Sequence, residues 1–291
     1  MTIAHLFLWT TAAIWGFAFV AQSVAMDSIG PHSFNSVRFL LATLSLLPLL
    51  LIFKSKERQD KKRLWLGGIA GGCCLFLGST FQQVGLQYTT AGNAGFITSM
   101  YIVMVPIAGI LLGHKTESNT WLGVALAIIG LYCLTVGPNF SINKGDAIEL
   151  VGTFFWTGHV LIIAYLSRYV SALPLSIVQF IVATLFCSIT AFALEEPTRE
   201  GLEHAWWPLI YTGVASSGIA FTLQTLGQKN VSPSISALIL STEGVFAAIG
   251  GWMLMGESLS TRAMVGCGFI LIGIIVSQWP RATRKAAALT S

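Results

Sequence analysis

Ten long apolar runs follow one another along this chain, separated by short polar breaks. They cover about 4–25, 31–53, 64–87, 91–113, 119–137, 147–166, 173–194, 205–227, 233–255 and 262–280. An α-helix needs about 20 residues to cross the hydrocarbon core of a bilayer. Because lipid offers no hydrogen bonds to the backbone, each run is expected to form a helix. The sequence therefore predicts an all-α integral membrane protein with ten transmembrane helices.

The composition indicates that lipid surrounds most of the chain. Of the 291 residues, 54% are hydrophobic and only 10% are charged, whereas a soluble domain carries about 25% charged residues. The five cysteines lie inside apolar runs without a CxxC pair, so we expect no metal site and no disulfide framework. We expect no bound cofactor, because no nucleotide-binding motif is present, and no nucleic-acid partner for the basic stretch 54–63.

The Lys and Arg residues are divided unevenly between the two sides that the runs define. Three lie on one side, at Lys144, Arg199 and Arg262, and Arg38 lies within a run. The other twelve share the opposite side: Lys54, Lys56, Arg58, Lys61, Lys62, Arg63, Lys115, Arg168, Lys229, Arg281, Arg284 and Lys285. Short cytoplasmic loops are rich in Lys and Arg, so both termini are expected in the cytoplasm and the acidic loop 195–203 outside.

The two halves of the chain repeat each other. RFLLATL at 38–44 matches QFIVATL at 179–185, and Trp15 matches Trp156 at the same offset of 141 residues. Gly85 matches Gly227 at an offset of 142. At an offset of 143, two glycines of the fifth run match two of the last run, namely Gly123 with Gly266 and Gly130 with Gly273. These four matches follow the same order in both halves, and their offset changes by only two residues along the chain. They indicate a duplication.

The duplication predicts two domains, a five-helix repeat at 1–140 and a second at 141–291 that ends in a short basic tail. Because five is odd, the second repeat enters the membrane upside down relative to the first. Inverted repeats are the design of secondary transporters, which bind their substrate near mid-membrane between the repeats. The organisation of the chain therefore predicts transport.

Two stretches resemble the EamA-type members of the drug/metabolite transporter superfamily. They are GLQYTTAGNAGFITSMYIVMVPIAGILLG at 85–113 and NVSPSISALILSTEGVFAAIGGWMLMGESLSTRAMVGCGFILIGIIV at 230–276. The family pattern S-x-E-P-V is matched by Thr242-Glu243-Gly244-Val245, with Gly in place of Pro, and Gly256-Glu257 matches a later Gly-Glu. The first stretch keeps Pro106 but has Gly113-His114 where many relatives have Gly-Glu. The resemblance implies a ten-helix carrier of the bacterial inner membrane, typically an exporter of amino acids or other metabolites.

Glu243 is interpreted as the only acid buried deep within an apolar run. It lies about ten residues from the cytoplasmic end of its helix, hence about 15 Å deep. An ionisable group at such depth costs on the order of 3 kcal/mol and is a candidate functional site. It could bind a proton or a substrate ammonium group, or it could be a carboxyl group that is hydrogen-bonded for packing alone.

Two further ionisable residues lie within runs. Arg38 is about 10 Å from the outer end of its helix, where it could extend to the surface or bind a substrate carboxylate with its guanidinium group. His159 lies near mid-depth and could line the cavity or pack between helices. The repeat mates Trp15 and Trp156 are too deep to be interfacial anchors, so we interpret them as cavity walls, with packing against lipid as the alternative.

The predicted substrate-binding set combines these residues with neutral hydrogen-bonding side chains. It comprises Trp15, Arg38, Gln82, Thr98, Tyr101, Trp156, His159, Gln224, Thr242 and Glu243. We expect a secondary carrier that exports a small amphipathic metabolite by alternating access, acts as a monomer in the lipid bilayer and is not an enzyme. Protons are a candidate coupling ion. A membrane-embedded transferase and a channel are the alternatives, although isolated polar groups suit the first poorly and an inverted repeat suits the second poorly.

Overall fold

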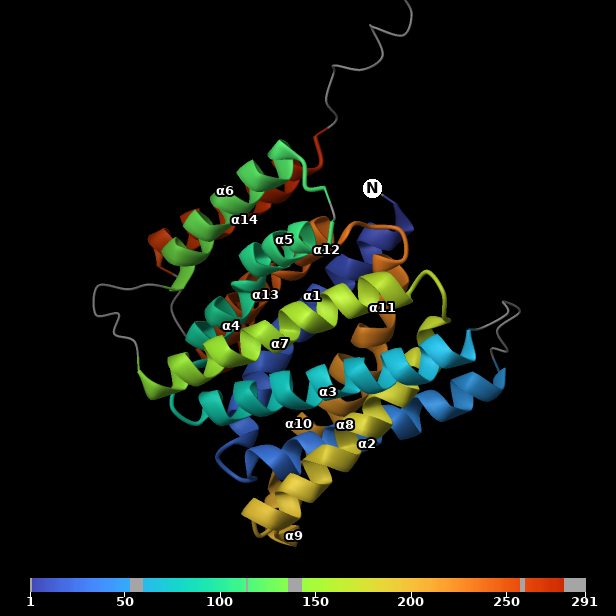
Figure 1. Cartoon of the computed structure of the whole chain (residues 1–291). Coiled ribbons are helices and arrows are strands. Elements are labelled where there is room, and N and C mark those ends of the chain that lie inside the picture. Colours follow the sequence, from blue (N-terminus) through green and yellow to red (C-terminus); the bar gives the residue numbers. More distant parts are fainter. Residues whose placement is uncertain (1, 53–59, 114, 136–142, 257–259, 280–291) are drawn as a thin grey trace, which may run out of the picture.

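The computed structural model describes residues 2–52, 60–113, 115–135, 143–256 and 260–279. Throughout these ranges the chain is helical and contains no strand (Figure 1). Eight helical segments are long and apolar enough to cross a membrane, and the shorter apolar helices α6 and α14 bring the total in these ranges to ten. The fold is thus the all-α membrane architecture of two inverted five-helix repeats that the sequence predicts.

Each repeat supplies five helical segments. The first repeat contains α1 (Ile3–Ala25), α2 (Pro31–Ile52), α3 (Lys61–Leu86), α4 (Ala91–Ser99) with α5 (Tyr101–Leu111), and α6 (Ser118–Thr135). The second contains α7 (Lys144–Leu166), α8 (Ala172–Leu194), α10 (Trp206–Ile210) with η1 (Tyr211–Ala220) and α11 (Phe221–Gln228), α12 (Pro233–Leu240) with α13 (Glu243–Met255), and α14 (Thr261–Ser277). A short helix, α9 (Arg199–His204), lies between α8 and α10.

The fourth segment of each repeat is interrupted near its middle, although the sequence predicted one helix for each. The first break falls at Met100, whose N–H bonds the carbonyl of Ile97 at 3.0 Å, and the second at Ser241 and Thr242, where the N–H of Thr242 bonds Ile239 O at 3.1 Å. These tight three-residue turns replace the regular α-helical bonds. Because Ser99 and Tyr101 beside the first break, and Ser241 and Thr242 at the second, are buried in the protein, irregular backbone is tolerated at membrane depth.

The third segment of the second repeat is also irregular. Its central ten residues, η1, form a π-helix between α10 and α11. π-helices are rare and frequently occur at functional sites. The carbonyl of Ser216 in this stretch accepts a hydrogen bond of 2.9 Å from the Trp15 indole N–H of α1. The π-helix therefore faces the first helix of the other repeat.

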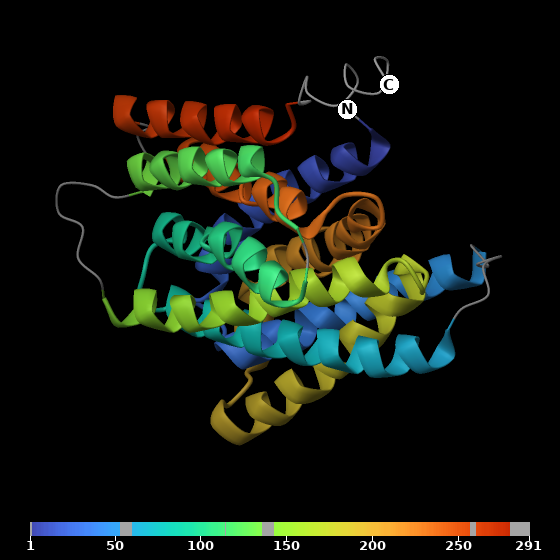
Figure 2. The same ribbon diagram turned by 45° about the horizontal axis from the view of Figure 1, so that its top comes forward.

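The fifth helices of the two repeats, α6 and α14, pack side by side at one edge of the molecule (Figures 1 and 2). Their contact rests on glycines, since a Cβ on Gly123 would meet the carbonyl of Gly273, and a Cβ on Gly130 would meet that of Gly266. Small residues at a helix interface let two backbones approach closely within a membrane. All four glycines of the two sequence matches therefore lie at this interface, each packed on a glycine of the other match.

The glycine-rich helix α3 lies against both α7 and α8. A side chain on Gly68 would overlap Val178, and one on Gly72 would overlap Val182 and the carbonyl of Gln179. These are the close approaches that small residues at four-residue spacing allow between membrane helices. The run with the most glycine thus forms the longest continuous helix, Lys61–Leu86, of the described chain.

The loop that follows α8 holds the beginning of α2. The Glu195 carboxylate accepts hydrogen bonds of 2.8 Å from the backbone N–H groups of His32 and Ser33, and one of 2.6 Å from the Ser33 hydroxyl. An acid at a helix N-terminus binds N–H groups that have no partner within the helix. Several residues used in the sequence interpretation lie outside the described ranges, namely Lys54, Lys56, Arg58, His114, Glu257, Arg281, Arg284 and Lys285.

The α6–α14 contact predicts a contrast between two glycines of α14. In Gly266→Ala the new methyl group would overlap the backbone of Gly130 and Leu134, whereas in Gly268→Ala it would meet nothing within 4 Å. Overpacking costs about 1–3 kcal/mol, so Gly266→Ala should lower the melting temperature of the purified protein. Gly268→Ala should keep or raise it, because Ala is a better helix former than Gly. Equal melting temperatures would contradict this account of the contact.

Candidate functional site

A cavity lies between the two repeats, with an empty volume of about 490 Å³ that includes the part open to solvent. The lining comes from both repeats: Trp15, Phe19, Gln22, Arg38, Gln82, Thr98, Tyr101, Trp156, His159, Val160, Ser216, Phe221, Gln224 and Glu243. The structure thus brings together nine of the ten predicted site residues, although their role in binding a substrate stays a prediction.

The two interrupted helices meet at this cavity. The Tyr101 hydroxyl, at the start of α5, donates a hydrogen bond of 3.0 Å to the Glu243 carboxylate at the start of α13. Beside it, the Ser99 hydroxyl lies 3.4 Å from the carbonyl of Ser241. Both contacts join residues that are 142 apart in the chain, the spacing of the repeat. The two breaks therefore touch at the axis that relates the repeats.

Arg38 is held inside the protein and does not extend to the surface. Its side chain is 4% exposed, and its Nη1 donates a hydrogen bond of 2.8 Å to the Gln22 side-chain oxygen. The same oxygen accepts a bond of 3.2 Å from the Gln82 amide. The guanidinium carbon also lies 4.6 Å from the centre of the Phe39 ring, and the Nε atom has no partner within the protein. Arg38 therefore retains hydrogen-bonding capacity at the cavity.

Aromatic rings form one wall of the cavity. The Phe221 ring lies between the repeat mates, with its centre 4.7 Å from that of Trp15 and 6.1 Å from that of Trp156. The His159 ring meets Phe221 edge-on at 5.4 Å, and its Nε2 lies 2.8 Å from the Gln179 side-chain oxygen. Such a wall gives a ligand a large apolar contact area with fixed geometry.

Several polar atoms at the cavity are buried without a partner in the protein. They are the indole nitrogen of Trp156, both side-chain polar atoms of Gln224 and the Nε of Arg38. Buried polar groups are usually hydrogen-bonded, so unsatisfied ones require an explanation. Their gathering around one cavity is typical of a site that binds a polar ligand.

Thr242 is the one predicted site residue that the structure does not place at the cavity. It is fully buried at the break before α13, and its hydroxyl donates a hydrogen bond of 2.7 Å to the carbonyl of Ile239. This bond occupies a carbonyl at the end of α12. The position of Thr242 thus accounts for the break, whereas its neighbour Glu243 lines the cavity.

Sequence reasoning missed five lining residues. They are Phe19, Gln22, Val160, Ser216 and Phe221. Gln22 could have been found, because it is a polar side chain within the first apolar run. Val160 and Phe221 carry no polar signal, and Ser216 lines the cavity from the π-helix, an element that the sequence did not predict.

Glu243 is not the only acid that the protein buries, although it remains the one near the middle of an apolar run. Glu149 of α7 is 0% exposed, and Asp146 of the same helix is 3% exposed, as is Glu243. Both acids lie near the beginning of α7. They are buried because the ends of α3 and α4 cover this part of α7.

Two buried ionisable side chains at the cavity have no charged partner. The ion pairs of the described chain are Asp60–Arg63 and Arg199–Glu203, both away from the cavity, so Arg38 and Glu243 each stand without a counter-charge. Within the same residues, no group of three or more His, Cys, Asp or Glu side chains could hold a metal ion. An acid and a base that face one cavity, supplied by different repeats, are therefore the main electrostatic feature of the site.

Inverted five-helix repeats with interrupted helices at a central polar cavity are the architecture of a membrane transporter. The model of the EamA-like transporter family matches residues 2–136 and again 143–279. The chain belongs to the EamA-like transporter family. It is 35% identical to an uncharacterized transporter of Archaeoglobus fulgidus over 94% of this chain and 85% of that protein.

Other relatives are more distant. The uncharacterized inner membrane transporter YedA of Escherichia coli is 25% identical over 90% of this chain and 86% of its own length. A solved crystal structure superimposes with a TM-score of 0.79 at 18% identity, covering 95% of this chain and 98% of the other. That likeness concerns the fold alone. Together with the family match, these relatives identify a multi-pass membrane transporter.

The Tyr101–Glu243 contact predicts a coupling energy that a double-mutant cycle can measure. Tyr101→Phe removes the donor and leaves a buried carboxyl group unsatisfied, which costs about 1–3 kcal/mol. The cost should largely disappear in a Glu243→Leu background. The changes in the free energy of unfolding of the two single variants should therefore not add up to that of the double variant. Ser99→Ala combined with Glu243→Leu is the control and should be additive, because the bond from Ser99 goes to Ser241. Additive effects in both cycles would contradict the contact.

Proposed function

We propose that the protein is a secondary carrier that exports a small zwitterionic metabolite, an amino acid or a related compound, by alternating access. The observation that carries this proposal is the pair of buried, unpaired charges at the cavity, Arg38 from α2 and Glu243 from α13. Leaving such charges unpaired is costly. A zwitterion supplies both counter-charges with one molecule.

The proposed mode of binding uses three parts of the site. The guanidinium group of Arg38 binds the substrate carboxylate, since its planar set of donors suits two carboxylate oxygens. Glu243 binds the ammonium group, while Trp15, Trp156 and Phe221 contact the apolar part of the molecule. Because the two charged residues belong to different repeats, the bound substrate links the repeats, and their relative rocking would expose it to one side of the membrane and then to the other.

The orientation and direction of transport are further parts of the proposal. We place the protein in the inner membrane with both termini in the cytoplasm, because the Lys and Arg residues gather on that side. External labelling of a cysteine placed at Thr198 tests this orientation. Export is the direction that the resemblance to EamA-type proteins implies. Transport in place of catalysis is supported by the transporter names of the relatives.

Recognition of a zwitterion can be tested with matched probes. Purified protein should be stabilised against heat by at least one amino acid, but not by its methyl ester, which lacks the carboxylate, or its N-acetyl derivative, which lacks the ammonium group. Arg38→Gln copies the residue at the matching position of the second repeat, Gln179, and should abolish the preference for the free acid over the ester. Stabilisation by ester and acid alike in the parent would overturn the assignment of Arg38.

Transport itself is tested in proteoliposomes with the amino acid selected by that screen. A carrier accelerates uptake of labelled substrate when the vesicles are preloaded with unlabelled substrate, whereas a channel does not. Acceleration by preloading is therefore the expected result. Its absence, with a stabilising substrate in hand, would contradict alternating access.

Proton coupling through Glu243 predicts a specific loss in Glu243→Gln. The amide keeps the shape and neutrality of the protonated acid but cannot exchange a proton. This variant should retain its fold and exchange substrate for substrate, yet lose the acceleration by a pH gradient that the parent shows. Glu200→Gln, in the exposed helix α9, is the matched control and should respond as the parent does. A Glu243→Gln variant that still responds to the gradient would exclude the proton role.

A further inference from the structure

Glu149 is a buried acid that the binding of a zwitterion does not use. It lies on α7, five residues after the helix begins, and its side chain is 0% exposed. Its Oε2 accepts one long hydrogen bond, 3.4 Å from the Thr98 hydroxyl, and its Oε1 has no partner within the protein. An ionised carboxylate with so few partners is strongly disfavoured in an apolar interior. The fold therefore encloses an acid at a position where charge is costly.

The repeat supplies an internal comparison for this position. The Glu149 side chain packs on Gly85, which is also close to the carbonyl of Gly145. At the position that the repeat makes equivalent, Leu8 packs on Gly227 in the same way. That glycine is also close to the carbonyl of Ala4. Leu8 and Ala4 precede Glu149 and Gly145 by 141 residues, and Gly85 precedes Gly227 by 142. The same packing thus forms with a leucine, and it requires no acid.

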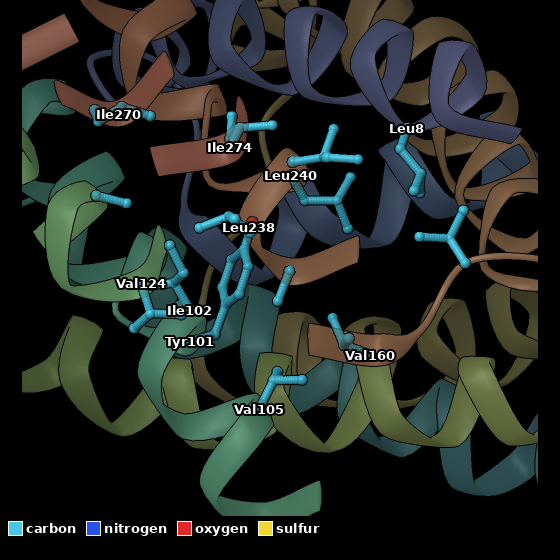
Figure 3. Packing of buried hydrophobic residues seen from close by; sticks show 14 of the residues in the cluster. Leu8, Tyr101, Ile102, Val105, Val124, Val160, Leu238, Leu240, Ile270 and Ile274 are labelled. Atoms are coloured by element: carbon cyan, nitrogen blue, oxygen red, sulfur yellow. The ribbon is translucent and has the colours of Figure 1, made fainter. Parts of the chain in front are cut away.

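Thr98, whose hydroxyl donates the hydrogen bond to Glu149, also has an apolar counterpart in the repeat. Thr98 lies 142 residues before Leu240, which is buried in the same apolar cluster as Leu8 (Figure 3). The two leucines therefore occupy the positions that are equivalent, by the repeat, to those of the hydroxyl group and the carboxyl group. Two matched polar replacements at positions that pack well with apolar residues indicate a role other than packing.

The surroundings of Glu149 contain no cation close enough to form an ion pair in the described chain. On α7 itself, Asp146 lies one turn earlier and Lys144 at the helix start, where its Nζ lies 4.7 Å from the centre of the Tyr88 ring. Among the other helices that contact α7, α4, α11 and α12 carry no titratable side chain, and α5 carries Tyr101. The basic residues of α3 lie at its far end, with Cys73 and Cys74 between.

Glu149 also lies between the helix end and the cavity. Towards the beginning of α7, the Thr89 hydroxyl donates a hydrogen bond of 2.6 Å to Asp146, which caps the helix together with Asn143. Towards the interior, Thr98 contacts Glu149 and at the same time lines the cavity. Side chains three residues apart on a helix share a face, so Asp146, Glu149 and Thr98 form a polar line from the beginning of α7 towards the cavity.

We infer that Glu149 is a second proton-binding residue, separate from Glu243, which exchanges its proton with the cavity through the Thr98 hydroxyl. A proton that arrives from water at the Asp146 end forms an O–H bond on the Glu149 carboxylate and neutralises it. On release, that bond breaks and the proton passes by way of the hydroxyl to water in the cavity. Only O–H bonds form and break, and no oxidant, reductant or metal takes part.

Infrared spectroscopy of the full-length protein in lipid nanodiscs tests proton binding directly. The C=O stretching band of a protonated carboxyl group is distinct from the bands of a carboxylate. Glu149→Gln should lose one protonated-carboxyl band that decreases in the parent as the pH is raised, and Glu243→Gln should lose a different one. A Glu149→Gln spectrum that retains every such band of the parent, or a Glu149 band that does not respond to pH, would overturn the inference.

The role of Thr98 has its own readout. Thr98→Val removes the hydroxyl at nearly constant volume, so the Glu149 band should change frequency and respond more slowly to a pH jump. Thr157→Val on α7 is the control, because the Thr157 hydroxyl bonds the carbonyl of Thr153 at 2.9 Å and does not touch Glu149. Thr157→Val should leave unchanged both the frequency of the Glu149 band and the rate at which it responds to the pH jump. Equal behaviour of the two variants would overturn the relay.

A second variant protects the test against loss of folding in Glu149→Gln. In this variant Glu149 and Thr98 are both replaced by leucine, the residue at the matching positions 8 and 240, and its melting temperature should equal or exceed that of the parent. The protonated-carboxyl band of Glu149 should also be missing from the spectrum of this double variant.

The purpose of this proton site rests on the proposed carrier function, but the infrared measurement does not require transport. A titrating Glu149 in a protein that fails to transport would therefore contradict only the proposed function.

Discussion

The two interrupted helices touch at their breaks, near the middle of the fourth segment of each repeat, and the arrangement of the site depends on this contact. Each break ends one helix and begins another, so backbone groups that a continuous helix would satisfy must find partners in the interior. Side chains at the breaks supply them, as the hydroxyls of Ser241 and Thr242 do for the carbonyls of Leu238 and Ile239. The breaks in turn bring Tyr101 and Glu243, the first residues of the second half-helices, within hydrogen-bonding distance at the cavity.

The cavity combines features from both repeats that no single helix could supply. Gln22 of α1 joins Arg38 of α2 to Gln82 of α3 through one amide oxygen. On the other side, Phe221 separates two tryptophans that occupy matching positions in the repeats. Charge, neutral hydrogen bonding and apolar contact therefore surround one space, which is what a small molecule with both charged and apolar parts requires.

Much of this architecture could be predicted from the sequence because membrane insertion restricts the possible folds so strongly. The apolar runs identified the helices, and the matching glycines and tryptophans identified the duplication. The breaks could not be predicted, because Met100 and Thr242 are not helix breakers, and an interruption there depends on partners that come from the tertiary structure. Glu149 was missed for a related reason. It lies near the beginning of its helix, and its burial depends on the neighbouring helices that cover it.

Gly123 packs on Gly273 and Gly130 on Gly266, although the sequence matches are Gly123 with Gly266 and Gly130 with Gly273. This exchange of partners is the property of an isologous interface, the kind that joins two identical subunits around a two-fold axis. In a dimer of identical chains, however, every substitution would appear on both sides of the axis. Joining the halves in one polypeptide removes that restriction, so an acid can stand at 149 while leucine remains at 8, and an arginine at 38 while glutamine remains at 179. A symmetric framework can thus carry an asymmetric set of charges.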